Sequence, residues 1–130
     1  MSYIYSNVED LEGTDKVGSK QCVALLEHYA KLPHHGVWKG GIPVLGNLSI
    51  AKGTAIATFV NGKYQSHVTG NHAAFYISQD AGGIWIMDQW ANDTTKPKVS
   101  KRYVRKKGML PKGSYVDPSN NAEAYSVIDM

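Results

Sequence analysis

One stretch near the N-terminus has the apolar spacing of an amphipathic helix, and the chain after residue 53 has the character of strands. The helical stretch covers residues 19–31, with Ser19 as a good N-cap and Pro33 just after its end. Its apolar side chains recur at i, i+3, i+4 and i+7: Cys22, Leu25, Leu26 and Tyr29. A helix of about three turns followed by strands is the order of an α+β domain rather than of alternating βαβ units.

The strand candidates are short apolar runs separated by turn residues. The run 54–60 ends at Asn61-Gly62, the best hairpin signal in the chain, and 63–68 follows it. A second hairpin is expected from 73–77 and 84–87. Further candidates are 98–104, 124–128 and the short run 42–45 inside the otherwise irregular loop 32–52. We therefore expect an α+β fold with one helix packed on an antiparallel sheet.

The composition is that of a folded chain. The 130 residues are 42% hydrophobic and 19% charged, which is too apolar for a disordered protein, and we expect a single domain over residues 1–130. No apolar run approaches the roughly 18 residues of a membrane span. The first ten residues have neither the basic nor the apolar region of an export signal. We expect synthesis in the cytoplasm without a signal peptide, and no membrane span.

Positive charge is concentrated in the C-terminal third. Basic residues outnumber acidic ones 14 to 11, and the excess lies between Lys96 and Lys112. Such a patch could favour an anionic partner, whether nucleic acid, lipid headgroups or a cell-wall polymer. It could equally be a solvated edge strand protected by lysines. Among the partners we favour the wall polymer and expect no nucleic acid.

The single cysteine, Cys22, decides between two functional classes. One cysteine excludes an internal disulfide and a multi-cysteine zinc site, so Cys22 is either a buried small hydrophobe or a reactive thiol. It lies in the first turn of the expected helix, where the positive end of the helix lowers the pKa of a thiol. A nucleophilic role also requires a histidine that takes the thiol proton and later protonates the leaving amine.

Among the five histidines, His72 is best placed to be that base. His28 lies nearly two turns along the helix on another face. His34 and His35 are adjacent in a loop without a third metal ligand nearby, and His67 lies in a polar stretch. His72 opens an apolar strand, which fixes its backbone on one side.

Two neighbouring residues compete to orient the imidazole of His72. If the strands 73–77 and 84–87 form a hairpin, Asp88 and Gln89 both return beside His72. The parity of the connecting loop decides which of them shares the His72 face, and a slip of one residue exchanges them. We favour Asp88, because a carboxylate stabilises imidazolium better than an amide does.

Three runs in this order resemble the CHAP and NlpC-type papain-like amidases of bacterial cell walls. They are VGSKQCVAL at 17–25, GTAIATF at 53–59 and GNHAAFY at 70–76. The chain is more similar to small bacterial members that resemble the amidase effectors of type VI secretion, through Asp-Gln-Trp at 88–90 and the run 119–128. Thr54 replaces an acidic residue of many relatives, and Gln-Cys-Val replaces the Asp-Cys-Ser of the NlpC-type branch, which favours the CHAP-like branch.

The resemblance implies a papain-like cysteine hydrolase acting on amide bonds of peptidoglycan stem peptides. It implies that Cys22 is the nucleophile, His72 the base and Asp88 the orienting residue, with the Cys22 backbone N–H in the oxyanion hole. It also implies a toxin secreted to act in the periplasm of a target bacterium, and a cognate immunity protein that covers the cleft.

Four further residues are candidates for substrate binding: Gln21, Trp38, Gln89 and Trp90. Aromatic rings stack on sugars or line peptide grooves, although Trp38 could instead pack its loop onto the core and Gln21 could face solvent. No phosphate-binding motif or metal-ligand spacing is present, so we expect no cofactor and no metal. The alternatives are a non-catalytic wall-binding module that uses Trp38, Trp90 and the basic stretch, and an acyltransferase on the same fold.

Overall fold

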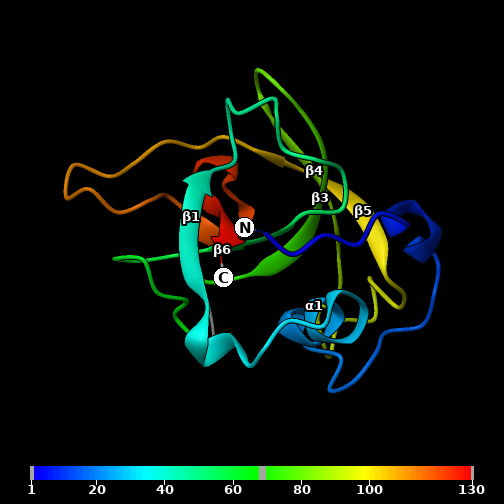
Figure 1. The fold of residues 1–130 in the computed structure, drawn as a ribbon. Coiled ribbons are helices and arrows are strands. Elements are labelled where there is room, and N and C mark those ends of the chain that lie inside the picture. Colours follow the sequence, from blue (N-terminus) through cyan, green and yellow to red (C-terminus); the bar gives the residue numbers. More distant parts are fainter. Residues whose placement is uncertain (1, 68–69, 130) are drawn as a thin grey trace.

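The framework of the protein is a six-stranded sheet, seen in a computed structural model that describes residues 2–67 and 70–129. The strand order is β1-β6-β2-β3-β4-β5, and every pairing described is antiparallel. Figure 1 labels five of these strands and the helix α1. The strands are β1 (Lys39–Pro43), β2 (Ala55–Thr58), β3 (Ala73–Asp80), β4 (Gly83–Asp88), β5 (Ser100–Arg105) and β6 (Tyr125–Asp129). The expected antiparallel sheet is confirmed.

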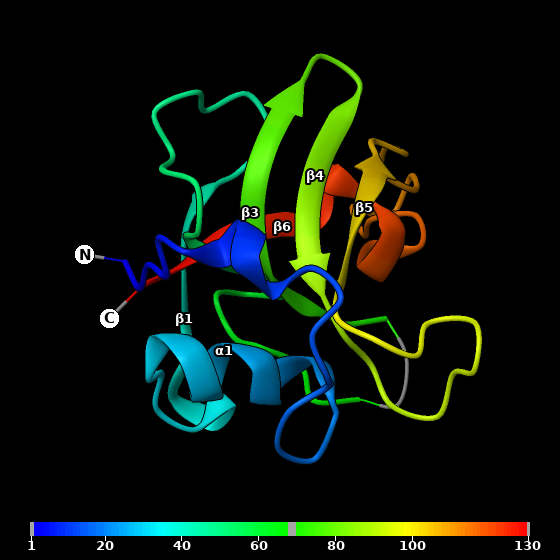
Figure 2. The same cartoon turned by 90° about the vertical axis from the view of Figure 1, so that its right-hand side faces the viewer.

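The helix α1 (Cys22–Ala30) lies at one end of the β3–β4 hairpin. Figure 2 shows β3 and β4 side by side, with the arrowhead of β4 directed toward the end at which α1 lies. Four short 3-10 helices complete the structure: η1 (Val8–Leu11), η2 (His35–Val37), η3 (Pro118–Asn120) and η4 (Ala122–Ala124). The start of β3 and the end of β4 are therefore both brought to the helix.

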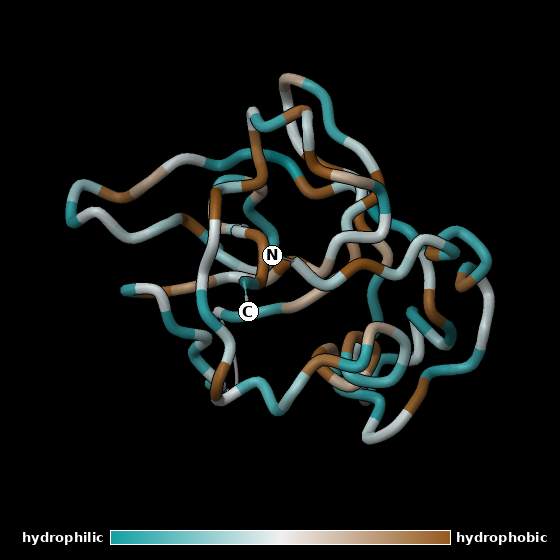
Figure 3. Tube along the Cα trace, in the orientation of Figure 1, coloured by the Kyte–Doolittle hydropathy of each residue, from teal (hydrophilic) through white to brown (hydrophobic). Residues whose placement is uncertain are grey.

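The sheet has a hydrophobic cluster on each face. Leu25 and Leu26 of α1 pack with Phe75 and Met87 on one face. Ile56 and other buried side chains form the cluster on the opposite face, with Tyr125 fully buried among them. The strands and α1 carry much of the hydrophobic colour in Figure 3, and the hydrophilic colour marks many of the outer turns. Burial on both faces fixes the strands as a rigid support for the side chains at their ends.

The helix begins two residues later than the sequence predicts. Its N-cap is Gln21 rather than Ser19, and the intervening Lys20 has φ 69°. The Ser19 hydroxyl accepts a hydrogen bond from the Gln21 N–H at 3.4 Å, so it closes a local turn before the helix. Cys22 is consequently the first residue of α1.

The hairpin expected over residues 54–68 does not form as predicted. Asn61 and Gly62 do make a tight turn, with φ 52° and 77°, but residues 63–67 form no strand, and residue 68 lies outside the described part of the chain. The reason is that β2 already pairs with β3 on one edge and with β6 on the other. Val60 and Lys63 do pair across the turn, with hydrogen bonds of 2.9 and 3.0 Å. Both edges of β2 are occupied, however, so the pairing does not continue along β2, and Lys63 also bridges to Lys39 of β1. The strand expected at 42–45 is β1, which begins earlier, at Lys39.

The β3–β4 hairpin contains a bulge that changes which side chains share a face. Asp80 pairs with Gly83 and Ser78 with Trp85, but the next pair is Tyr76 with Ile86. Ile77 is therefore an extra residue on β3. Without the bulge Gln89 would face the side of His72, whereas with it Asp88 does.

The basic stretch is an edge strand with many local partners. The strand β5 is the last in the sheet order, as the edge-strand interpretation expects. Lys98 forms an ion pair with Asp15, and Lys107 lies 2.8 Å from Asp117. Much of the positive charge is thus offset nearby, which weakens the case for a broad anion-binding surface. In the part of the chain that the structure describes, no helix has both the length and the apolar composition that a membrane span needs.

Candidate active site

Cys22 occupies the first position of α1, at the end of the helix where backbone N–H groups have no partner within the helix. The side chain is half-buried against the cluster that contains Leu25 and Leu26. The thiol therefore lies on the buried stripe of the helix and at its positive end, which places it beside the sheet rather than in open solvent.

Gln89 fixes the chain segment that leads into the helix. Its Oε1 accepts a hydrogen bond from the Val17 N–H at 3.0 Å, and its Nε2 donates to the carbonyls of Val17 at 3.1 Å and Gln21 at 2.8 Å. The Gln89 side chain is fully buried. These bonds account for the side-chain amide, so Gln89 supports the position of Cys22. The expectation that Gln89 binds substrate stays a prediction, which its full burial does not favour.

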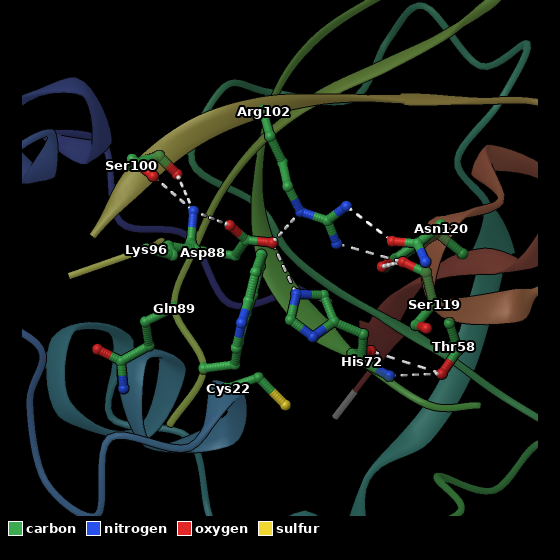
Figure 4. Close-up of polar contacts among 12 residues, drawn as sticks. Cys22, Thr58, His72, Asp88, Gln89, Lys96, Ser100, Arg102, Ser119 and Asn120 are labelled. Atoms are coloured by element: carbon green, nitrogen blue, oxygen red, sulfur yellow. Dashed lines mark hydrogen bonds and ion pairs between the residues drawn. The ribbon is translucent and has the colours of Figure 1, made fainter. Parts of the chain in front are cut away.

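His72 is held at the start of β3 by backbone contacts with Thr58. The His72 N–H donates to Thr58 Oγ1 at 3.0 Å, and the Thr58 N–H donates to the His72 carbonyl at 3.0 Å. The ring lies between the Asp88 carboxylate and the sulfur of Cys22 (Figure 4). Nε2 of His72 is 2.7 Å from Asp88 Oδ2. The structure therefore brings Cys22, His72 and Asp88 together, and it places Asp88 rather than Gln89 on the imidazole.

Two cations hold Asp88 on the side away from Cys22. Arg102 Nε donates to Asp88 Oδ2 at 2.7 Å, and Lys96 Nζ lies 2.8 Å from Oδ1 (Figure 4). Asp88 is fully buried and Lys96 is 7% exposed. Arg102 also donates to Asn120 Oδ1 at 2.9 Å. A buried carboxylate requires such partners, because an isolated charge in the interior is strongly unfavourable.

The charges in this group shift one another's pKa values. Burial raises the pKa of the Cys22 thiol, but the hydrogen bond and charge of His72 outweigh it, so the net pKa is lowered. Burial likewise lowers the pKa of His72, and Asp88 and Cys22 raise it to about 9. Burial opposes ionisation of Asp88 too, yet His72, Arg102 and Lys96 bring its pKa well below the usual range. Both shifts therefore favour the ion pair of a Cys22 thiolate and a His72 imidazolium.

The cleft beside His72 is about 380 Å³ in volume and polar in character. Gln21, which is exposed, and Trp90, which is half-buried, both line it. The Trp90 ring meets His72 edge to face at 5.9 Å and lies 4.7 Å from Lys96 Nζ. Trp90 therefore covers the charged side of the site while remaining at the cleft wall, so its expected contact with substrate stays a prediction, as does that of Gln21.

Trp38 does not line this cleft. It is 4% exposed, its Nε1 donates to the Pro33 carbonyl at 2.9 Å, and its ring lies 5.2 Å from that of Tyr64. This burial favours the alternative in which Trp38 packs its loop onto the core, and its contact with substrate stays a prediction. His34 and His35 stack on each other at 4.1 Å, and the described residues include no group of three or more side chains placed to hold a metal ion.

Over residues 2–128 the chain matches the family described as domesticated amidase effector 2. The chain belongs to this family. It is 50% identical over 133 residues to the type VI secretion amidase effector 2 protein of Salmonella typhi, covering 99% of this chain and 100% of that relative. It is 36% identical over 124 residues to domesticated amidase effector 2 of Ixodes scapularis, covering 91% of this chain and 75% of that relative.

A solved structure has the same fold. Type 6 secretion amidase effector 2 (Tae2) superposes with a TM-score of 0.93 at 50% identity, covering 98% of this chain and 94% of the other. Membership in this amidase effector family confirms the expected resemblance to type VI secretion amidase effectors and the α+β fold. As an amidase, the chain is a hydrolase of amide bonds.

The sequence did not identify three residues of this site. Lys96 and Arg102 were counted with the basic stretch, and nothing in their spacing links them to Asp88. Tyr64, whose hydroxyl lies 3.5 Å from Cys22 Sγ, falls in the stretch that was expected to be a strand. An isolated aromatic residue in a loop gives no sequence signal of contact with a thiol.

Proposed function

We propose that this protein is a cysteine amidase that hydrolyses amide bonds in the peptide stems of peptidoglycan, with Cys22, His72 and Asp88 as its triad. The observation that carries the proposal is one geometry: a thiol at a helix start, and an imidazole between it and a fully buried carboxylate (Figure 4). This is the arrangement that nucleophilic acyl transfer requires.

Acylation begins from the thiolate and the imidazolium. The Cys22 thiolate attacks the carbonyl carbon of the scissile amide, and a C–S bond forms as the carbonyl oxygen gains negative charge. The Cys22 backbone N–H, at the helix start, donates to this oxyanion. His72 then gives its proton to the leaving amine as the C–N bond breaks.

Deacylation restores the ion pair. Neutral His72 takes a proton from water while the water oxygen attacks the thioester carbon, and the C–S bond breaks to release the thiolate and the carboxylic acid product. Asp88 holds the ring at Nε2 throughout, so the other ring nitrogen stays directed at the reacting atoms.

A polar cleft suits a peptide substrate. Gln21 and Trp90 line its walls, where an amide and an indole can contact a peptide. We further propose delivery into the periplasm of a target bacterium, and a cognate immunity protein that covers the cleft, since a producer must survive its own wall amidase.

The test is digestion of isolated Gram-negative peptidoglycan, with released fragments identified by mass spectrometry. The wild type should release stem-peptide fragments with free carboxyl ends, and Cys22→Ala should release none while its thermal midpoint stays within about 2 °C, since one half-buried sulfur is removed. A Cys22→Ala variant with full activity would disprove the mechanism. Fragments carrying a transferred acyl group instead of a free carboxyl would indicate an acyltransferase.

A further inference from the structure

Cys22 has a second polar neighbour that the triad does not include. The Tyr64 hydroxyl lies 3.5 Å from Cys22 Sγ, within the range of a hydrogen bond to sulfur. It approaches from the 63–67 segment, whereas His72 approaches from β3. The titratable groups that act on the thiol are thus His72 and Tyr64.

The direction of the Tyr64 hydrogen bond follows from the groups behind it. The backbone N–H of His67 donates to Asn71 Oδ1 at 2.8 Å, which orients the Asn71 amide. Asn71 Nδ2 then donates to the Tyr64 oxygen at 3.3 Å. Because an amide NH₂ can only donate, the single hydroxyl proton of Tyr64 is left for the sulfur.

The ring of Tyr64 is held by aromatic packing that does not depend on its hydroxyl. Its centroid lies 5.2 Å from that of Trp38, 5.6 Å from His35 and 6.5 Å from Phe59. Rings at these distances pack favourably in tilted and edge-to-face arrangements. A phenylalanine at position 64 would therefore keep the ring in place and remove only the donor.

We propose that Tyr64, oriented by Asn71, donates a hydrogen bond to the Cys22 thiolate and is a second determinant of its ionisation beside His72. This rests on the proposed role of Cys22 as nucleophile. Tyr64 stays protonated as required, because burial and the charge of Cys22 both raise the pKa of its hydroxyl. The donor is neutral, so it supports the thiolate without adding a permanent charge beside it.

The experiment measures the rate of Cys22 alkylation by iodoacetamide against pH, which reads the thiolate directly and needs no peptidoglycan. Tyr64→Phe should raise the midpoint of this profile by about one pH unit, the usual size for a hydrogen bond to a charged group. The plateau rate at high pH should not fall, because a thiolate of higher pKa is the stronger nucleophile.

Asn71→Asp tests the direction of the hydrogen bond between Tyr64 and Cys22, because aspartate has almost the same shape as asparagine. A carboxylate at position 71 accepts the Tyr64 proton instead of donating to its oxygen, so the sulfur loses its donor and gains a nearby negative charge. The midpoint should rise further than in Tyr64→Phe. Tyr29→Phe is the matched control, since Tyr29 is on the same helix as Cys22 but packs on Tyr5 at 5.1 Å; its midpoint should equal that of the wild type.

The outcomes separate this proposal from the triad. A low wild-type midpoint that Tyr64→Phe leaves unchanged would overturn the role of Tyr64 and leave the triad intact. A wild-type midpoint at the ordinary value for cysteine would contradict both the ion pair and the Tyr64 bond. Near-wild-type thermal midpoints for Tyr64→Phe and Asn71→Asp would show that a shift does not come from unfolding.

Discussion

The two sides of the Cys22–His72 pair are built from different chemistry. On the His72 side, Asp88 is fully buried and contacts Lys96 and Arg102 at 2.8 and 2.7 Å. On the Cys22 side, the neighbour is a neutral hydroxyl of Tyr64 surrounded by aromatic rings. Permanent charges thus set the protonation of the imidazole, and neutral donors adjust the sulfur.

This difference has a chemical reason. A permanent cation at the sulfur would lower the pKa of the thiol further, but the nucleophilicity of a thiolate falls as its pKa falls. The imidazole has no such conflict, because it must only hold its charge and release a proton to the leaving amine. A strong buried network at Asp88 and a weak neutral one at Cys22 therefore fit their separate tasks.

The largest expected effect comes from comparing His72→Ala with Asp88→Asn. His72→Ala removes the base and should lower kcat by about 10⁶-fold, whereas Asp88→Asn should lower it by about 10⁴-fold. Stability should follow the opposite order. Asp88→Asn leaves Lys96 and Arg102 without their carboxylate and should cost about 3–5 kcal/mol, while His72→Ala leaves Asp88 with both cations.

Two measurements on the same two variants check these opposite orders. Kinetics of peptidoglycan digestion give kcat, and urea unfolding gives the free energy of unfolding. If one variant were the worse in both measurements, the network at Asp88 would not be separable from the base. Gln89→Ala should reduce activity less than Asp88→Asn, because it acts only through the segment before α1. A greater loss in Gln89→Ala would transfer the orienting role to Gln89.

The choice between Asp88 and Gln89 shows where sequence reasoning ended. The positions of Cys22 at a helix start and of His72 at a strand start follow from local patterns, and both could be predicted. The face of Asp88 depends on the bulge at Ile77. If the register of the Asp80–Gly83 turn continued along the hairpin, Gln89 would lie beside His72. No residue type near position 77 predicts the bulge that changes this register.

Other errors came from contacts distant in sequence. The hairpin after Asn61-Gly62 was a sound local prediction, but β6 and β3 occupy both edges of β2. Lys96 and Arg102 have the composition of a surface patch. The pairing of β4 with β5 brings Arg102 to Asp88, and Lys96 reaches Asp88 from the loop between these strands. The site was therefore predictable where its backbone setting is local and unpredictable where its charges are paired across strands.

A smaller expected effect is a shift in the pH profile of kcat/KM, which distinguishes the Asp88 side of the pair from the Tyr64 side. Lys96→Met removes one cation from the His72 side, which reduces repulsion of the imidazolium and leaves Asp88 to stabilise it more strongly. The pKa of His72, already about 9, should rise, so the alkaline limb of the pH profile of kcat/KM should move up by about half a unit to one unit. The acid limb, which reports the thiol, should move much less.

Tyr64→Phe should give the complementary result, with the acid limb shifted and the alkaline limb nearly unchanged. Lys96→Arg keeps the positive charge and is the matched control for Lys96→Met. Equal movement of both limbs in either variant would show that the Asp88 side and the Tyr64 side act as one coupled unit, and not as two separate controls of His72 and Cys22.

The smallest expected effect is on how the thermal stability of Cys22→Ala depends on pH. This variant has no thiolate beside His72, so Asp88 alone stabilises the charged imidazole. A histidine whose pKa is raised on folding contributes its full stability below its unfolded pKa, about 6.5, and loses it as pH rises through the folded pKa. With Asp88 still 2.7 Å from His72, the thermal midpoint of Cys22→Ala should fall by about 2–5 °C as the pH rises above about 6.5. The fall should end at a lower pH than in the wild type, because Cys22 no longer raises the pKa of His72. Differential scanning calorimetry measures this, and Cys22→Ala/His72→Gln should show no such fall. An equal fall in the double variant would place the alkaline sensitivity elsewhere in the protein and leave the charge of His72 without a measurable link to Asp88.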